Sequence, residues 1–307
     1  MDEEVKLFDR RQSFPDLTAA NRLGQLVGVE EARNTLKRSL GILINPANLK
    51  EWGETFHKDA KTILTYTQRR PPLIILAGDV GTGKTELAET IGDDVARQEG
   101  IGVTLLPLSL STRGSGRVGE MTTLLSSAFE EAFKEAQRLS GEGKKSKGGI
   151  ILLVDEADAL TQSRENAQMH HEDRAGVNAF IRGVDRLAQQ HLPAAVILCT
   201  NRLSSIDPAV RRRAAAIFEF TRPDEAQRLA VLSVPLKEVG FTDENIKQIV
   251  KLTGPKGKAK SGGFTYSDLT QRLLPTLIID AYPDGPVTYK RAVEIIKKMK
   301  PTPEFKG

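Results

Sequence analysis

The sequence has one cysteine and one tryptophan, and aromatic residues make up only 5% of its 307 residues. Cys199 alone cannot form an internal disulfide, which excludes a disulfide-stapled secreted fold and favours a reducing compartment. No apolar run approaches the ~18 residues that span a membrane. The first residues also lack the apolar core of a signal peptide. We therefore expect a cytoplasmic protein with no membrane partner.

A strong excess of one charge is also missing. The chain has 44 Lys and Arg residues against 40 Asp and Glu residues, which gives a formal net charge of +4. Composition therefore does not favour nucleic acid as a partner. The length allows a sizeable core, and it suits one large domain followed by a small one.

The rest of the chain is organised around an apolar strand over 73–77 that runs into a glycine-rich loop and then a helix over 86–96. The loop, residues 78–85, fits the pattern G-x-x-x-x-G-K-[ST]. The alternative is a glycine-rich turn that binds nothing, but such a turn has no use for a Lys-Thr pair at the helix start. The pattern predicts a nucleoside triphosphate site.

The residue types in this phosphate loop explain the chemistry. Glycines let backbone N–H groups approach phosphate oxygens, and the helix start adds its own free N–H groups and dipole. Lys84 supplies an ammonium for the β- and γ-phosphates, and the Thr85 hydroxyl is a ligand for Mg²⁺. The nucleotide-binding residues predicted here are Gly78, Val80, Gly81, Thr82, Gly83, Lys84 and Thr85.

Two further strands end in polar residues. The apolar run over 150–154 delivers Asp155 and Glu156 to the carboxyl end of a strand, where ligands bind in open α/β sheets. Asp155 is placed to hold Mg²⁺ and Glu156 to polarise the attacking water, although a strand can also end in acidic residues at the surface. Asn201 follows the next apolar run and could orient the water or contact the γ-phosphate. We expect Asp158 only to cap a turn.

Three successive arginines, Arg211, Arg212 and Arg213, follow an Asp-Pro pair. They could form a basic patch for nucleic acid or a solvated helix end. If the protein forms a ring, one of them could instead reach the neighbour's γ-phosphate as an arginine finger.

Apolar β runs at 73–77, 103–108, 150–154, 195–200 and 217–220 alternate with helical segments. This pattern predicts an α/β fold with a parallel sheet and helices on both faces. After Arg222-Pro223 the pattern is helical up to Met299. We therefore expect an N-terminal arm and large ATPase domain over 1–222 and a helical lid over 223–307.

Together these motifs resemble those of AAA+ ATPases, over about residues 26–275. The resemblance implies a five-stranded parallel sheet in the order 5-1-4-3-2, ATP and Mg²⁺ bound between adjacent subunits, and a hexameric ring whose central loops pull on a polypeptide. In that scheme Val27 and Gly28 lie near the adenine. The segment 262–269 would begin the lid helix that completes the nucleotide pocket.

Within this superfamily the chain is most similar to the pachytene-checkpoint remodellers that unfold HORMA-domain proteins, through the segments 154–160, 176–185 and 206–214. The similarity implies that Arg213 is the finger, with Arg212 next. It places Arg117 and Val118 in the first pore loop. Ser267 stands where this subfamily has a lid arginine, and Arg272, one turn away, is a weak substitute.

A remodeller of this kind without an adaptor domain resembles the bacterial members that accompany HORMA proteins and cyclic-oligonucleotide synthases in anti-phage (CBASS) operons. The implied role is to dismantle the synthase–HORMA complex and so restrain signalling. The alternative is a DNA-linked AAA+ ATPase, such as a helicase or clamp loader, suggested by residues 211–213 and the basic segment 297–300. Against it, no winged-helix or helix-turn-helix pattern follows the lid.

Overall fold

The computed structural model describes residues 7–110, 120–141, 145–160, 169–255 and 262–304. Its internal contacts divide the chain into two compact units. The sheet unit comprises Met1–Gln25, Glu31–Ala77 and Thr85–Glu219. The lid unit comprises Leu26–Glu30, Gly78–Lys84 and Phe220–Gly307, so most of the phosphate loop groups with the lid.

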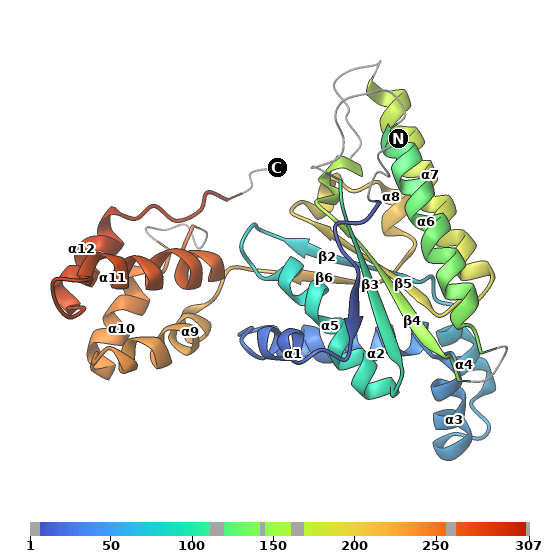
Figure 1. Ribbon diagram of the computed structural model, residues 1–307, viewed down its shortest axis with the longest axis horizontal. Coiled ribbons are helices and arrows are strands. Elements are labelled where there is room, and N and C mark those ends of the chain that lie inside the picture. The colour runs from blue at the N-terminus through green and yellow to red at the C-terminus, as the bar shows by residue number, and fades with distance from the viewer. Residues whose placement is uncertain (1–6, 111–119, 142–144, 161–168, 256–261, 305–307) are drawn as a thin grey trace. The chain divides into compact units, whose positions relative to one another are not determined.

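One six-stranded sheet has the order β1-β3-β4-β5-β2-β6 (Figure 1). Neighbours along β3-β4-β5-β2 pair in parallel, whereas β1 is antiparallel to β3. The α/β class is therefore confirmed. The strands are β1 (Gln12–Phe14), β2 (Leu73–Gly78), β3 (Gly102–Ser109), β4 (Gly148–Asp155), β5 (Ala194–Thr200) and β6 (Ala214–Phe220).

The prediction of five strands, all parallel, was wrong, because the N-terminal arm contributes β1 as an antiparallel edge strand. Phe14 of this strand is buried, and its ring lies where Gly92 leaves room on helix α5 (Lys84–Glu99). Three residues are too short to show the alternation of a strand in the sequence. Without β1 the order is β6-β2-β5-β4-β3, which is 5-1-4-3-2 counted from the phosphate-loop strand.

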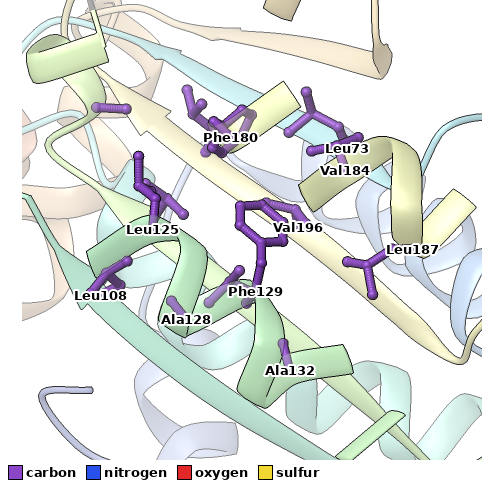
Figure 2. Packing of buried hydrophobic residues seen from close by; sticks show 14 of the residues in the cluster. Leu73, Leu108, Leu125, Ala128, Phe129, Ala132, Phe180, Val184, Leu187 and Val196 are labelled. Carbon is purple, nitrogen blue, oxygen red and sulfur yellow. The ribbon is translucent and has the colours of Figure 1, made fainter. Parts of the chain in front are cut away.

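Helices cover both faces of the sheet. The two long helices α6 and α7 lie side by side on one face, and Phe129 and Phe180 meet there edge to face at 5.5 Å between ring centroids (Figure 2). Alternate residues of the central strands point to the opposite face of the sheet. They are buried too, as expected for strands covered by helices on both faces. The helices of this part are α1 (Leu17–Gly24), α2 (Glu30–Ile44), α3 (Pro46–Phe56), α4 (Lys61–Gln68), α5 (Lys84–Glu99), α6 (Glu120–Leu139), α7 (Met169–Gln189) and α8 (Pro208–Arg211).

The lid unit is helical and has its own core, which includes Leu232, Phe264 and Ile296. Capping boxes begin its first two helices, at Asp224 and Thr242. Its elements are α9 (Glu225–Glu238), α10 (Asp243–Leu252), a π-helical turn (Asp268–Leu273), α11 (Leu274–Ala281) and α12 (Tyr289–Lys298). Within the described residues, no helix has the length and apolar character to cross a membrane.

A fully buried carboxylate ties the C-terminal segment to the lid. Asp268 accepts hydrogen bonds from the Thr265 N–H at 3.0 Å, from the N–H and hydroxyl of Thr302 at 2.9 and 2.8 Å, and from Arg272. Burial alone would raise the pKa of Asp268, but these bonds outweigh it and the pKa lies below its ordinary value.

We expect Asp268→Ala to lower the free energy of unfolding of the lid by about 2–3 kcal/mol, because it leaves the buried Thr265 N–H and the half-buried donors of Thr302 without an acceptor. Since the folded pKa is depressed, the stabilisation is complete above the unfolded pKa of ~3.9 and is lost as the pH falls below it towards the folded pKa. Urea unfolding followed by circular dichroism at pH 7 and pH 3 measures both effects. Asp280→Ala, which removes an exposed ion pair with Arg291, is the control. An equal loss in both variants would contradict the role of Asp268.

Candidate nucleotide site

The phosphate loop joins β2 to α5, and glycines occur in it for two different reasons. At Gly78 the φ angle is 145°, and a Cβ would overlap the carbonyl of Phe220, so main-chain packing requires glycine. At Gly83 the φ angle is 93°, and a Cβ would meet only Leu26, at 3.9 Å. The loop is therefore open at Gly83, where α5 begins, as a phosphate cradle requires.

Lys84 is the first residue of α5, and its side chain is buried against the loop. The ammonium donates to the carbonyls of Gly78 and Asp79, both at 2.8 Å. The Thr82 hydroxyl also donates to the Asp79 carbonyl, at 2.7 Å, whereas Val80 is exposed. The ammonium and the first N–H groups of α5, which have no acceptor inside the helix, form the cationic part of the site.

The lid residues that sequence reasoning assigned to the pocket lie against this loop and the segment before α2. The Ser267 N–H donates to the Gly81 carbonyl at 3.2 Å. A Cβ on Gly28, which follows half-buried Val27, would overlap the hydroxyl of Tyr266. Burial raises the pKa of Tyr266 to about 12, with Asp224 and Glu30 adding to the shift. The Tyr266 phenol therefore stays protonated at neutral pH and can donate a hydrogen bond beside Gly28.

Arg272 does not replace the missing lid arginine in this structure. Its guanidinium binds Asp268 and the carbonyl of Lys300. The Ser267 hydroxyl donates to Gln271 at 3.0 Å. Ser267 therefore forms its hydrogen bond to the phosphate loop through its backbone N–H, while its hydroxyl bonds Gln271.

In the sheet unit, Asp155 ends β4 beside the first turn of α5. Its carboxylate accepts hydrogen bonds from the Thr85 hydroxyl and from the Glu156 N–H, the latter at 2.8 Å. Burial raises the pKa of Asp155 above its ordinary value, although both hydrogen bonds oppose the shift. A hydroxyl and a carboxylate oxygen brought together are the donor types that Mg²⁺ takes from protein, so the residues fit the predicted ion.

Glu156 follows in a left-handed conformation, with φ at 53°, and its side chain is exposed. Residues other than Gly, Asn and Asp adopt this conformation at a cost of roughly 1–2 kcal/mol. Such costs cluster at functional sites, where the surrounding structure holds the residue in place. The conformation supports a functional role for this carboxylate over a plain acidic strand end.

Asn201 is held by a residue that sequence reasoning took for a turn cap. Asp158, in a 3₁₀ turn over Ala157–Leu160, accepts from the Thr200 hydroxyl at 2.5 Å and from the Asn201 side-chain amide at 3.1 Å. It also accepts from the Asn201 N–H at 3.2 Å. Because β4 and β5 are parallel neighbours, residues just beyond both strands meet. The predicted order of the strands was therefore the one feature from which the contact between Asp158 and Asn201 could have been predicted.

Two of the three arginines around α8, Arg212 and Arg213, make local contacts through their side chains. Arg213 donates to both carboxylate oxygens of Asp185 on α7, at 2.7 and 3.0 Å, which raises its pKa, and to the Ala209 carbonyl at 3.1 Å. Arg212 donates to the Pro208 carbonyl at 3.3 Å. Arg213 is thus pre-positioned within its own chain, and about a third of its side chain is exposed.

The predicted site residues fall into three groups. The predicted pore-loop residues Arg117 and Val118 lie outside the described residues. The sheet unit contains Thr85, Asp155, Glu156, Asn201, Arg212 and Arg213, and the lid unit contains Val27, Gly28, Gly78, Val80, Gly81, Thr82, Gly83, Lys84 and Ser267.

The sequence matches a known family of ATPases. The model of the "ATPase family associated with various cellular activities (AAA)" matches residues 74–222. The chain is 55% identical, over 98% of its own length and 96% of the relative's, to CD-NTase-associated protein 6 of Escherichia coli strain MS 115-1. The chain belongs to the AAA family of ATPases.

This AAA protein is also similar to two solved structures that include Trip13. It matches a chain in the structure of the E. coli MS115-1 HORMA:CdnC:Trip13 complex with a TM-score of 0.88 and 54% identity, over 97% of each chain. It matches the structure of Rhizobiales Trip13 with a TM-score of 0.74 and 48% identity, over 96% of this chain and 99% of the other. The AAA α/β fold class and the subfamily resemblance are therefore confirmed, whereas the predicted strand count is not.

Proposed function

We propose that this AAA protein hydrolyses ATP to disassemble a complex between a HORMA-domain protein and a cyclic-oligonucleotide synthase, and so restrains an anti-phage signalling system. The observation that carries the proposal is the 54% identity to a chain in the HORMA:CdnC:Trip13 complex, over 97% of both chains. The phosphate loop and the Asp155–Glu156 pair supply the chemistry that such work needs.

Each residue has a proposed part in hydrolysis. Lys84 and the loop N–H groups bind the phosphates. Val27, Gly28 and the turn at Ser267 line the pocket for the adenine. Thr85 and Asp155 would hold Mg²⁺, which neutralises charge on the β- and γ-phosphates. Glu156 polarises the attacking water. Asn201, held by Asp158, orients that water or the γ-phosphate.

We also propose a homo-hexameric ring in which Arg213 acts on the neighbour's nucleotide. Arg213→Ala is expected to lower ATP turnover roughly tenfold or more, since arginine fingers contribute large factors to such reactions. Mixing this variant with Lys84→Ala subunits should restore part of the turnover, because each variant supplies the half-site that the other lacks. The steady-state ATPase rate is measured across mixing ratios.

Asp185→Asn is the control for a purely structural role of Arg213, because it breaks the same ion pair and leaves the arginine in place. We expect its ATPase rate to stay closer to that of the wild type than the rate of Arg213→Ala. No rescue at any mixing ratio would contradict a finger that acts across an interface.

ATPase stimulation distinguishes the proposal from a DNA-linked function. The rate is measured with a purified HORMA-domain protein and with duplex and single-stranded DNA, at about 50 mM and about 200 mM salt. We expect stimulation by the HORMA protein at both salt concentrations. Stimulation by DNA alone would contradict the proposal and favour the helicase- or clamp-loader-like alternative.

A further inference from the structure

The phosphate loop contains a carboxylate that the proposed chemistry does not use. Asp79 is the second residue of the loop, and less than a fifth of its side chain is exposed. Its Oδ1 accepts from the Val80 N–H at 2.9 Å, and its carbonyl accepts from both Lys84 and Thr82. A negative charge in this loop opposes the binding of a polyphosphate, because like charges shielded from water repel more strongly.

Arg222 neutralises this carboxylate. Its Nε donates to Asp79 Oδ2 at 2.7 Å, its Nη2 lies 2.5 Å from the same oxygen, and its Nη1 donates to the Gly263 carbonyl at 2.7 Å. Only 10% of the Arg222 side chain is exposed. All three residues belong to the lid unit. One guanidinium therefore joins the phosphate loop to the segment that begins the lid turn.

The same segment contacts the phosphate loop at a second point. Gly263 precedes Phe264, which is buried in the lid core, and Ser267 then donates to the Gly81 carbonyl. The phosphate loop is thus bound to the lid at Asp79 and again at Gly81.

We propose that Arg222 is a positioning residue that sets the affinity for ATP by cancelling the charge of Asp79, and that its bond to the Gly263 carbonyl holds the guanidinium in place for this role. The inference rests on the proposed ATP site. It assigns to Arg222 an electrostatic role that a purely structural tie would not have. With the arginine removed, the Asp79 carboxylate loses this guanidinium and repels the phosphates more strongly. With both charges removed, that repulsion disappears.

The test is a double-mutant cycle on the full chain, with the dissociation constant for a fluorescent ATP analogue and Mg²⁺ as the readout. Arg222→Gln is expected to weaken binding about tenfold or more, since truncating one partner of a buried charge pair leaves the other uncompensated. Asp79→Asn should bind at least as tightly as the wild type. The double variant should return to within about threefold of the wild type, a difference below ~0.7 kcal/mol. Turnover at saturating ATP should change little in each.

Control measurements distinguish a failure of the role proposed for Arg222 from a failure of the proposed ATP site. Arg291→Gln removes an exposed lid arginine from a similar ion pair and should leave the dissociation constant unchanged. If the wild type binds no nucleotide, the proposed function fails. If the wild type binds but Arg222→Gln binds equally well, or the double variant is as weak as Arg222→Gln, the role of Arg222 is overturned. Should Arg222→Gln not fold, Arg222→Lys keeps the charge and is expected to bind ATP as the wild type does; a tenfold loss there would overturn the inference.

Discussion

A Glu156→Gln variant is expected to bind ATP as tightly as the wild type and to hydrolyse it at least about a hundredfold more slowly, the loss typical of removing a general base. The amide has the size of the carboxylate but cannot accept a proton from water. Binding is retained, because the proposed phosphate and Mg²⁺ contacts come from Lys84, Thr85 and Asp155. The two readouts are single-turnover phosphate release and the dissociation constant for an ATP analogue.

The left-handed conformation of Glu156 makes the choice of glutamine important. A β-branched replacement at a φ angle of 53° would add backbone strain and confuse chemistry with folding. Glu219→Gln, which removes an exposed carboxylate from β6, is the matched control and should hydrolyse ATP at the wild-type rate. A Glu156→Gln protein with normal turnover would show that another group activates the water.

Lys84→Ala is expected to weaken ATP binding by roughly a hundredfold or more, on the order of 3 kcal/mol. The substitution removes the only side-chain cation of the 78–85 loop and, with it, the donor to the Gly78 and Asp79 carbonyls. Helix α5 should persist, because alanine has the highest helix propensity. Titration with a fluorescent ATP analogue measures the loss.

The control for Lys84→Ala is Lys290→Ala, which removes an exposed lysine from the lid helix α12. This variant has the same loss of net charge and should bind ATP normally. Wild-type affinity in Lys84→Ala, with the fold intact by circular dichroism, would contradict the assignment of residues 78–85 as the phosphate-binding loop.

The sequence predicts those parts of the fold in which one segment carries the whole signal. Long apolar runs identify β2, β4 and β5, because strands buried on both faces need apolar residues at consecutive positions. The glycine and Lys-Thr pattern likewise identifies the phosphate loop. Strand β1 escapes prediction because only three residues pair and a single side chain, Phe14, is buried. Its place depends on the edge of β3 and on space beside Gly92.

Contacts between distant segments account for what the sequence did not show in the candidate site. Asp158 looked like a turn cap, but its carboxylate holds Asn201, 43 residues further along the chain. Arg222 looked like the start of a domain boundary, yet it pairs with Asp79, 143 residues away. A single arginine or aspartate in a sequence gives no signal of such a pair, because both residue types are common on protein surfaces. Only burial and geometry show that these groups depend on each other.

The most direct test of the account is the fate of a purified complex between a HORMA-domain protein and a cyclic-oligonucleotide synthase, such as the HORMA and CdnC proteins of E. coli MS115-1. The complex is incubated with catalytic amounts of this AAA protein and ATP, and the bound synthase is measured by size-exclusion chromatography. We predict release of the synthase by the wild type and none by Glu156→Gln or without ATP. A complex that stays intact while the wild type hydrolyses ATP, or one that Glu156→Gln dismantles equally well, would contradict ATP-driven remodelling.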